Sequence, residues 1–156
     1  MLQRRLLLAA ATALPLVAYA QAPASLPTKF DPSRDAAADV RTGIDLARAQ
    51  KKRVLVDVGG EWCIWCHILD KFIASHPPVK RLVDENFVVV KVNFSPQNRN
   101  EAVLSQWPKV KGYPHLFVLD ADGKLVHSQN TDELEAGKDY DEAKVIAFLE
   151  KHRRAK

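Results

Sequence analysis

The chain has 156 residues, with 23 Lys and Arg against 19 Asp and Glu, and 47% of its residues are hydrophobic. This composition excludes a disordered or collagen-like chain, the length suits one compact domain, and the small positive balance argues against a nucleic-acid partner, which needs a clustered basic face. Only two cysteines occur, Cys63 and Cys66, which excludes a scaffold of several disulfides and a four-cysteine metal site.

Residues 1–20 have the pattern of a secretory signal peptide. Arg4 and Arg5 provide a positive start, an apolar run continues to Tyr19, and Ala18-Tyr19-Ala20 matches a small-x-small cleavage site. The apolar run is shorter than the roughly 20 residues that cross a bilayer, so a membrane anchor is the weaker interpretation. We expect cleavage after Ala20 and a periplasmic location. Cleavage removes two arginines and no acids, which lowers the formal net charge from +4 to +2.

After a flexible leader over residues 21–34, hydrophobic periodicity and turn residues predict alternating helices and strands. The apolar residues Val40, Ile44 and Ala47 recur at helical spacing, whereas residues 54–58 form a β-branched run with an acid inside it. The expected elements are a helix over residues 35–50, a strand over 54–58, a helix over 63–75, a short helix over 79–85, a strand over 87–92, a helix over 101–107, strands over 115–119 and 124–127, a polar loop over 129–138, and a last helix capped by Asp139.

This order of elements predicts an α/β domain over residues 35–156. A strand, a helix and a second strand almost always pair their strands in parallel with a right-handed crossover. The turn residues Asp120-Ala121-Asp122-Gly123 indicate an antiparallel hairpin near the end of the sheet. We therefore expect a central mixed sheet of four to five strands with helices on both faces.

The two cysteines lie in the motif Trp62-Cys63-Ile64-Trp65-Cys66-His67, at the predicted start of a helix. Unpaired backbone N–H groups and the positive end of the helix dipole favour a thiolate at Cys63 and lower its pKa. Such a thiolate attacks a substrate disulfide, and Cys66, one turn further in, then resolves the mixed disulfide. We predict that Cys63 is the nucleophile and Cys66 the resolving thiol.

The residues around this motif resemble the thioredoxin family. Residues 56–66 are similar to the family's strand with a buried acid followed by Trp-Cys-x-x-Cys, and Lys111-Gly112-Tyr113-Pro114 is similar to its cis-proline loop. Lys91 and the turn Asp122-Gly123 match further family positions, so that the resemblance covers about residues 35–152. It is strongest to exported members, such as the C-terminal domain of membrane thiol:disulfide interchange reductases. The resemblance implies a thioredoxin fold.

Several further residues receive predicted roles. A carboxyl inside a Val-rich strand has a raised pKa, so Asp57 can accept the proton of Cys66, and the resemblance implies that Lys91 is its partner in this proton relay. The resemblance also implies that Pro114 is cis and that Tyr113 and Pro114 bind an extended substrate through the backbone. We expect Trp62 to cover one side of the disulfide and an exposed Trp65 to contact the partner.

Two other interpretations of the motif remain open. Cys63, Cys66 and His67 also match the attachment pattern of a c-type haem, although the chain's only methionine, Met1, falls within the predicted signal peptide and so cannot act as a distal ligand. The same three residues, with His115, can instead bind Cu(I) or Zn in a metal chaperone.

The sequence thus predicts an exported thiol:disulfide oxidoreductase acting in the reducing or isomerising direction. Its partners are expected to be proteins with disulfides or thiols and a membrane or periplasmic redox partner. No cofactor and no bound metal is required for this chemistry, because the two sulfurs carry the electrons themselves. The dipeptide Ile64-Trp65 between the cysteines leaves the redox potential open.

Overall fold

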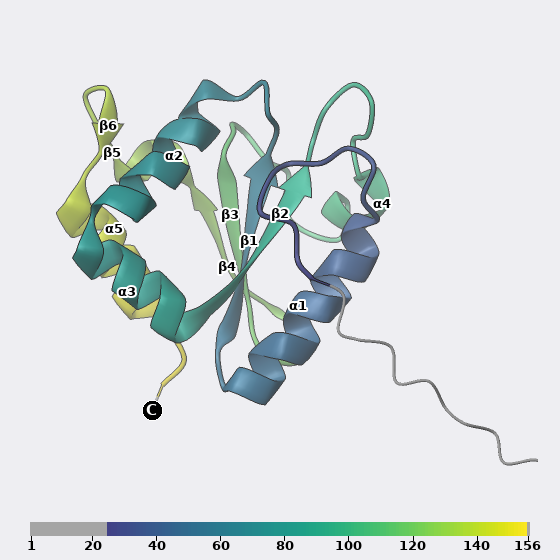
Figure 1. Ribbon diagram of the computed structural model, residues 1–156, viewed down its shortest axis with the longest axis horizontal. Coiled ribbons are helices and arrows are strands. Elements are labelled where there is room, and N and C mark those ends of the chain that lie inside the picture. The colour runs from purple at the N-terminus through teal and green to yellow at the C-terminus, as the bar shows by residue number, and fades with distance from the viewer. Residues whose placement is uncertain (1–24, 156) are drawn as a thin grey trace, which may run out of the picture.

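The computed structural model describes residues 25–155 (Figure 1). The predicted signal peptide, residues 1–20, and the first part of the predicted leader lie outside the described residues. Within residues 25–155, no helix is both long enough and apolar enough to cross a membrane.

The observed elements alternate along the chain much as the sequence predicts. They are α1 (Ala36–Gln50), β1 (Arg53–Gly59), α2 (Ile64–Ser75), α3 (Pro77–Asn86), β2 (Phe87–Asn93), α4 (Glu101–Leu104), β3 (His115–Leu119), β4 (Leu125–Asn130), the 3-10 helix η1 (Thr131–Leu134), β5 (Glu135–Ala136), β6 (Asp139–Tyr140) and α5 (Glu142–His152). Four strands form one sheet in the order β2-β1-β3-β4, and β5 and β6 form a separate hairpin. The predicted α/β fold with a mixed sheet is confirmed.

The central strand β1 pairs in parallel with β2 and antiparallel with β3. Asp57 is in register with Lys91 on one side and with Leu116 on the other, and His115 is opposite Val58. The crossover through α2 and α3 produces the parallel pair, whereas the turn at Gly123 joins β3 to β4 as an antiparallel hairpin. Because β1 is an inner strand, its carboxyl end places Gly59 and the turn that leads to α2 at the middle of the sheet edge.

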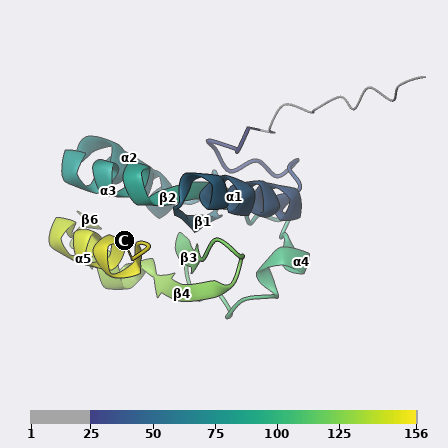
Figure 2. The same cartoon turned by 90° about the horizontal axis from the view of Figure 1, so that it is seen from below.

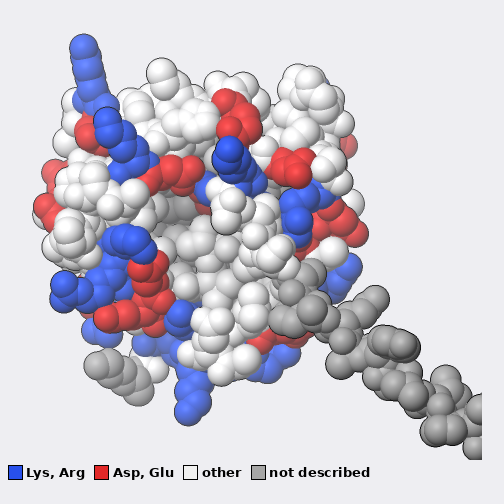
Figure 3. Space-filling view, viewed as in Figure 1, with Lys and Arg blue, Asp and Glu red and all other residues white. Residues whose placement is uncertain are grey.

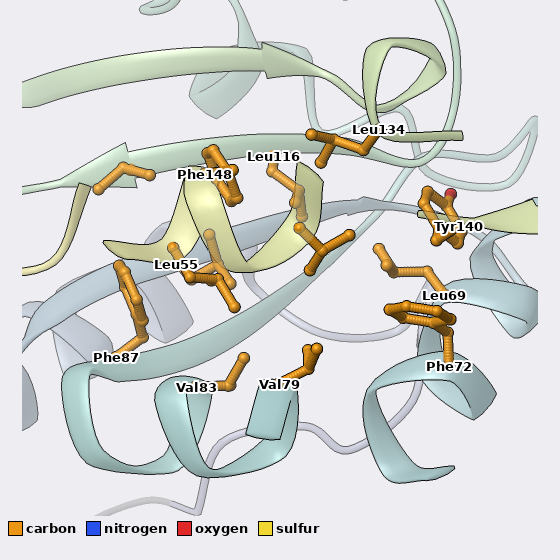
Figure 4. Packing of buried hydrophobic residues seen from close by; sticks show 13 residues of the cluster. Leu55, Leu69, Phe72, Val79, Val83, Phe87, Leu116, Leu134, Tyr140 and Phe148 are labelled. Carbon is orange, nitrogen blue, oxygen red and sulfur yellow. The ribbon is translucent and has the colours of Figure 1, made fainter. Parts of the chain in front are cut away.

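Helices cover both faces of the sheet, because alternate residues of β1 point to opposite sides. Val54 and Val56 pack with α1 and α4, whereas Leu55 faces α2, α3 and α5. Figure 2 shows β2, β1, β3 and β4 stacked between α2, α3 and α5 on one side and α1 and α4 on the other. Figure 4 shows the larger apolar core, in which Leu55 lies above Val83 and Val79 of α3, while Phe72 of α2 lies beside Leu69 and Tyr140.

Three helices among residues 25–155 begin after a residue whose side chain accepts a hydrogen bond from the backbone N–H three residues later. Asp35 caps α1, Cys63 caps α2, and Asp141 caps α5 by accepting a hydrogen bond from the Lys144 N–H at 3.0 Å. The prediction that Asp139 caps the last helix is wrong, because Asp139 lies in β6.

Other boundaries also differ from those predicted from the sequence. The helix α3 begins at Pro77 rather than Val79, since prolines in the first turn lose no intrahelical hydrogen bond. The helix α4 ends at Leu104, short of the predicted limit at residue 107, and Pro108 disfavours helical backbone only at Trp107. The predicted loop over residues 129–138 instead completes β4, forms η1 and enters a hairpin that turns at Gly137, whose φ is 66°.

The predicted flexible leader over residues 21–34 is also corrected in its described part. Phe30 is 2% exposed, and Arg34 forms an ion pair with Asp39 at 2.5 Å. One buried aromatic ring in a short segment gives no periodic pattern, which is why its composition alone suggested a linker. The segment over residues 25–35 is packed against the domain.

Candidate active site

Cys63 and Cys66 are joined by a disulfide at the N-terminus of α2, with their Cα atoms 5.3 Å apart. The sulfur of Cys63 accepts a hydrogen bond from the backbone N–H of Cys66 at 3.1 Å. Cys66 is fully buried, and Cys63 is the sulfur nearer the helix end. The same N–H and the helix dipole would stabilise a thiolate on Cys63 once the disulfide is reduced.

The chain turns into α2 through a short glycine-containing segment. The Cys63 N–H donates to the carbonyl of Gly60 at 2.9 Å, which sets the sharp turn after β1. A Cβ atom at Gly59 would overlap the sulfur of Cys66 and lie 3.1 Å from the ring of Phe30. Glycine at position 59 therefore lets the inner sulfur lie directly against the end of β1.

Behind the disulfide, Lys91 joins two carboxylates. Its ammonium lies 2.8 Å from Asp57 Oδ2 and 2.8 Å and 3.0 Å from the two oxygens of Asp70. Asp57 and Lys91 are both buried, whereas the Asp70 side chain is 44% exposed. The three groups thus form a chain of charges from the interior to the surface.

The burial of this cluster shifts its protonation. Burial raises the pKa of Asp57 above the ordinary value of an aspartate, although the neighbouring Lys91 opposes the shift. Burial alone would lower the pKa of Lys91, but Asp57 and Asp70 outweigh it, and the pKa of Lys91 is raised. One oxygen of Asp57, Oδ1, is buried without a hydrogen-bond partner within the described residues. An oxygen in this state is available to a proton.

Three aromatic rings form a wall beside the disulfide. Tyr113 stacks on Phe94 with ring centroids 4.8 Å apart, and Trp62 meets Tyr113 edge-on at 5.6 Å. The Trp62 Nε1–H donates to the carbonyl of Phe94 at 2.7 Å, while the residue remains 57% exposed. The Tyr113-Pro114 peptide bond is cis, as the family resemblance implies, and the Pro114 carbonyl accepts a hydrogen bond from Thr131 Oγ1 at 2.6 Å.

The two residues between the cysteines lie differently from each other. Trp65 is half-buried, with its ring edge-on to Tyr140 at 5.7 Å, so the expectation of an exposed Trp65 is wrong. Its position on α2 turns it toward the core beside β6, which the sequence pattern did not predict. Ile64 instead takes the outward position and is 71% exposed. The exposed apolar surface next to Cys63 is therefore made by Trp62 and Ile64.

A hollow of about 480 Å³ adjoins the far side of the aromatic wall. Its apolar lining comes from five residues, Phe94, Leu104, Trp107, Val110 and Tyr113. Arg99 and Lys109 lie at its margin, and Glu101 faces Arg99 at 3.9 Å. Because Phe94 and Tyr113 belong to both features, the hollow and the disulfide share one wall.

The residues proposed as metal or haem ligands do not converge in the described part of the chain. His67 Nε2 lies 2.9 Å from the carbonyl of Glu61, and His115 Nε2 lies 2.8 Å from Ser128 Oγ. Among residues 25–155, no three His, Cys, Asp or Glu side chains are grouped as a metal site would require.

The sequence interpretation missed three residues that the fold brings to the site. Asp70 binds Lys91, Phe94 stacks on Tyr113, and Phe30 packs against both cysteines. Asp70 follows Cys66 by one helical turn, so helical spacing could have placed it on the face of the inner cysteine. Phe30 gives no comparable local signal.

Comparisons with known proteins agree with this geometry. A family model described as thioredoxin-like matches residues 35–121. The thiol:disulfide interchange protein DsbD of Pseudomonas fluorescens is 33% identical over 101 residues, which cover 64% of this chain and 17% of that protein. The chain therefore spans less than a fifth of the length of this curated relative.

For two solved structures the superposition with this chain includes nearly the whole of the other protein. The disulphide isomerase from Xylella fastidiosa superposes with a TM-score of 0.67 at 26% identity, covering 81% of this chain and 96% of that one. The C-terminal domain of DsbD from Neisseria meningitidis, in its oxidised form, gives a TM-score of 0.55 at 26% identity and covers 80% and 99%. The similarity therefore extends over the sheet, the helices and the Cys-x-x-Cys segment.

Proposed function

We propose that this chain, which belongs to the thioredoxin-like family, reduces or isomerises disulfides of exported proteins. Its domain is similar to those of thiol:disulfide oxidoreductases. The observation that carries the proposal is the Cys63–Cys66 disulfide at the N-terminus of α2, with a buried carboxyl in the strand behind it.

The proposed reaction begins with the reduced protein. The Cys63 thiolate attacks one sulfur of the substrate disulfide, forming a mixed disulfide and releasing the other substrate sulfur as a thiolate that takes up a proton. Asp57 then accepts the proton of Cys66, and the Cys66 thiolate attacks Cys63. This second attack closes the Cys63–Cys66 disulfide and releases the second substrate thiol. Two electrons pass to the substrate in each cycle.

An extended substrate segment fits the surface beside Cys63. Trp62 and Ile64 offer exposed apolar contacts, and the cis-proline loop offers the backbone groups of Tyr113, since the Pro114 carbonyl is already bonded to Thr131 Oγ1. The hollow beyond Tyr113 adds a second apolar contact for the same segment. Figure 3 shows cationic and anionic residues interspersed on the face that it presents, with uncharged residues between them.

The direction and the location are further parts of the proposal. The similarity to a disulphide isomerase and to the C-terminal domain of an interchange protein supports the reducing or isomerising direction. The signal pattern in residues 1–20 supports export to the periplasm. After each reductive cycle the chain holds a disulfide, so a membrane or periplasmic dithiol partner must return two electrons to it.

The test is reduction of a disulfide-containing protein such as insulin by the purified mature chain. The Cys63→Ser variant should lose turnover, whereas Cys66→Ser should accumulate a mixed disulfide with the substrate, because its resolving thiol is absent. Turnover that survives in Cys63→Ser would exclude the proposed nucleophile.

Equilibration with glutathione measures the reduction potential of the Cys63–Cys66 pair, which decides the direction. A potential near roughly −270 mV marks a reductant, whereas a potential near roughly −120 mV marks an oxidant and would contradict the proposed direction.

A further inference from the structure

The segment over residues 25–35, here called the strap, crosses the edge of the sheet where the disulfide lies, before α1 begins. In Figure 1 it is the purple segment that passes in front of the carboxyl ends of β1 and β2. The Phe30 N–H donates to Glu61 Oε1 at 3.0 Å, and Asn98 Nδ2 donates to the Pro32 carbonyl at 2.9 Å. The strap is thus tied to the turn before Cys63 and to the loop after β2.

The side chain of Phe30 lies between the disulfide and the buried ion pair. Its ring packs with Cys63 and Cys66 in a small apolar cluster of its own. The ring centroid lies 4.2 Å from the ammonium of Lys91, which is a cation–π distance. Phe30 is 2% exposed, so it separates both features from water on this side.

We infer that Phe30 is a positioning residue of the redox centre, which keeps water from Asp57 and Lys91 and thereby holds Asp57 ready to exchange a proton with Cys66. This inference rests on the proposed function, because it assigns Phe30 a part in the proton step. The remainder of the strap acts by fixing Phe30 in place, through Glu61 and Asn98.

The electrostatic consequence follows from the groups that face Asp57. They are Lys91 from β2, Asp70 from α2 and Tyr140 from β6. The charge of Asp57 contributes to the raised pKa of Tyr140. Burial is the main cause of the raised pKa of Asp57. A smaller side chain at position 30 would admit water beside Lys91, stabilise the Asp57 carboxylate and lower the pKa of Asp57.

If Phe30 served only to pack the core, its substitution would have a different effect. A core phenylalanine contributes to the free energy of unfolding wherever it is buried, but it need not affect the protonation of a distant carboxyl. Phe87 provides the matched control, because it is 3% exposed in the larger core and belongs to a different apolar cluster from the cysteines.

The experiment compares the mature wild-type chain with Phe30→Ala, Phe30→Leu and Phe87→Leu. Carboxyl ¹³C NMR of the oxidised protein gives the midpoint of Asp57 titration, and single-turnover exchange gives the pH dependence of the resolving step. In Phe30→Ala we expect the Asp57 midpoint to fall by about one pH unit and the acid limb of the rate profile to move with it. In Phe30→Leu the apolar cover remains and the shift should be smaller but in the same direction. Phe87→Leu should leave the midpoint unchanged.

The inference is overturned if the Asp57 midpoint in Phe30→Leu, and in a folded Phe30→Ala, equals that of the wild type. It is equally overturned if Phe87→Leu shifts the midpoint as much, since the effect would then be general loosening of the core. The titration does not require turnover. A wild-type chain that fails to exchange disulfides would therefore count against the proposed function, while the Asp57 midpoints still test the placement of Phe30.

Discussion

At the scale of single residues, Lys91 determines how the charges behind the disulfide are balanced. Its ammonium binds Asp57 and Asp70 from two different elements, and it is almost entirely buried. Removing one partner of a buried ion pair leaves the other charge without compensation, which costs more than the intact pair contributes. Lys91 is therefore expected to affect both the stability and the proton step.

The Lys91→Met substitution should lower the free energy of unfolding by about 3 kcal/mol at pH 7, because Asp57 loses its buried partner. Lys91 lowers the pKa of Asp57, so its loss should raise that pKa further and move the exchange rate profile to higher pH. Urea unfolding and the rate profile measure the two effects. Lys80→Met is the control, because Lys80 pairs with Asp84 on the surface, where a pair contributes about 0.5 kcal/mol. Equal losses in the two variants would contradict a special role for the buried pair.

The sequence predicted the residues of the site that lie within a short motif or a family pattern. Cys63, Cys66 and Asp57 fall within ten residues of each other, so their spacing alone indicates their arrangement. Lys91 is predicted through the resemblance, and its register opposite Asp57 explains the contact. Phe30 could not be predicted, because its contacts with Glu61 and Lys91 join segments that only the folded chain brings together.

At the scale of elements, α5 shows how much depends on the residue that begins a helix. Asp141 accepts the Lys144 N–H and thereby satisfies one of the unpaired donors in the first turn. The helix that follows carries Val145, Phe148 and Leu149 into the larger core. A weaker start of α5 therefore reduces the packing of that core.

The Asp141→Ala substitution should lower the free energy of unfolding by about 1 kcal/mol, which is the usual cost of losing an N-cap. Asp139→Ala should cost less than half as much, since within residues 25–155 Asp139 accepts a hydrogen bond only from its neighbour, the Tyr140 N–H. Urea unfolding of the oxidised protein measures both. A larger loss for Asp139→Ala would restore the boundary expected from the sequence.

The elements with a strong repeating pattern were predicted most closely. The helix α1 and the strands β1 and β2 lie within one residue of their predicted limits, because apolar periodicity and β-branched runs act along the whole element. The elements predicted poorly are short. Single features decide them, such as the prolines that open α3 and the turn at Gly137 between β5 and β6.

At the scale of the whole molecule, two histidines make the fold sensitive to acid. Burial lowers the pKa of His115 to about 4, and burial together with the nearby His127 lowers the pKa of His152 to about 4. In the unfolded chain both groups titrate near the ordinary value of about 6.5. Between these values the unfolded state binds protons that the native state does not, so the free energy of unfolding falls as the pH falls.

We therefore expect the melting temperature to decrease from pH 6.5 toward pH 4. The His115→Gln substitution keeps a polar group that can reach Ser128 but removes the titration. It should reduce the loss of stability between pH 6.5 and pH 4 by about 2 kcal/mol relative to the wild type. Calorimetry at several pH values checks this difference. Identical pH dependence in the two proteins would show that folding does not lower the pKa of His115.

The order of elements along the chain places β1, α2, α3 and β2 before β3, although β3 lies next to β1 in the sheet. Cys63, Cys66 and the whole of α2 are translated well before Tyr113, whose ring belongs to the aromatic wall beside the disulfide. Synthesis runs from the N-terminus, so the strand–helix–strand unit is translated while this flank is still missing. In a chain that folds in this order, the side of Cys63 and Cys66 that Tyr113 covers stays uncovered until β3 pairs with β1.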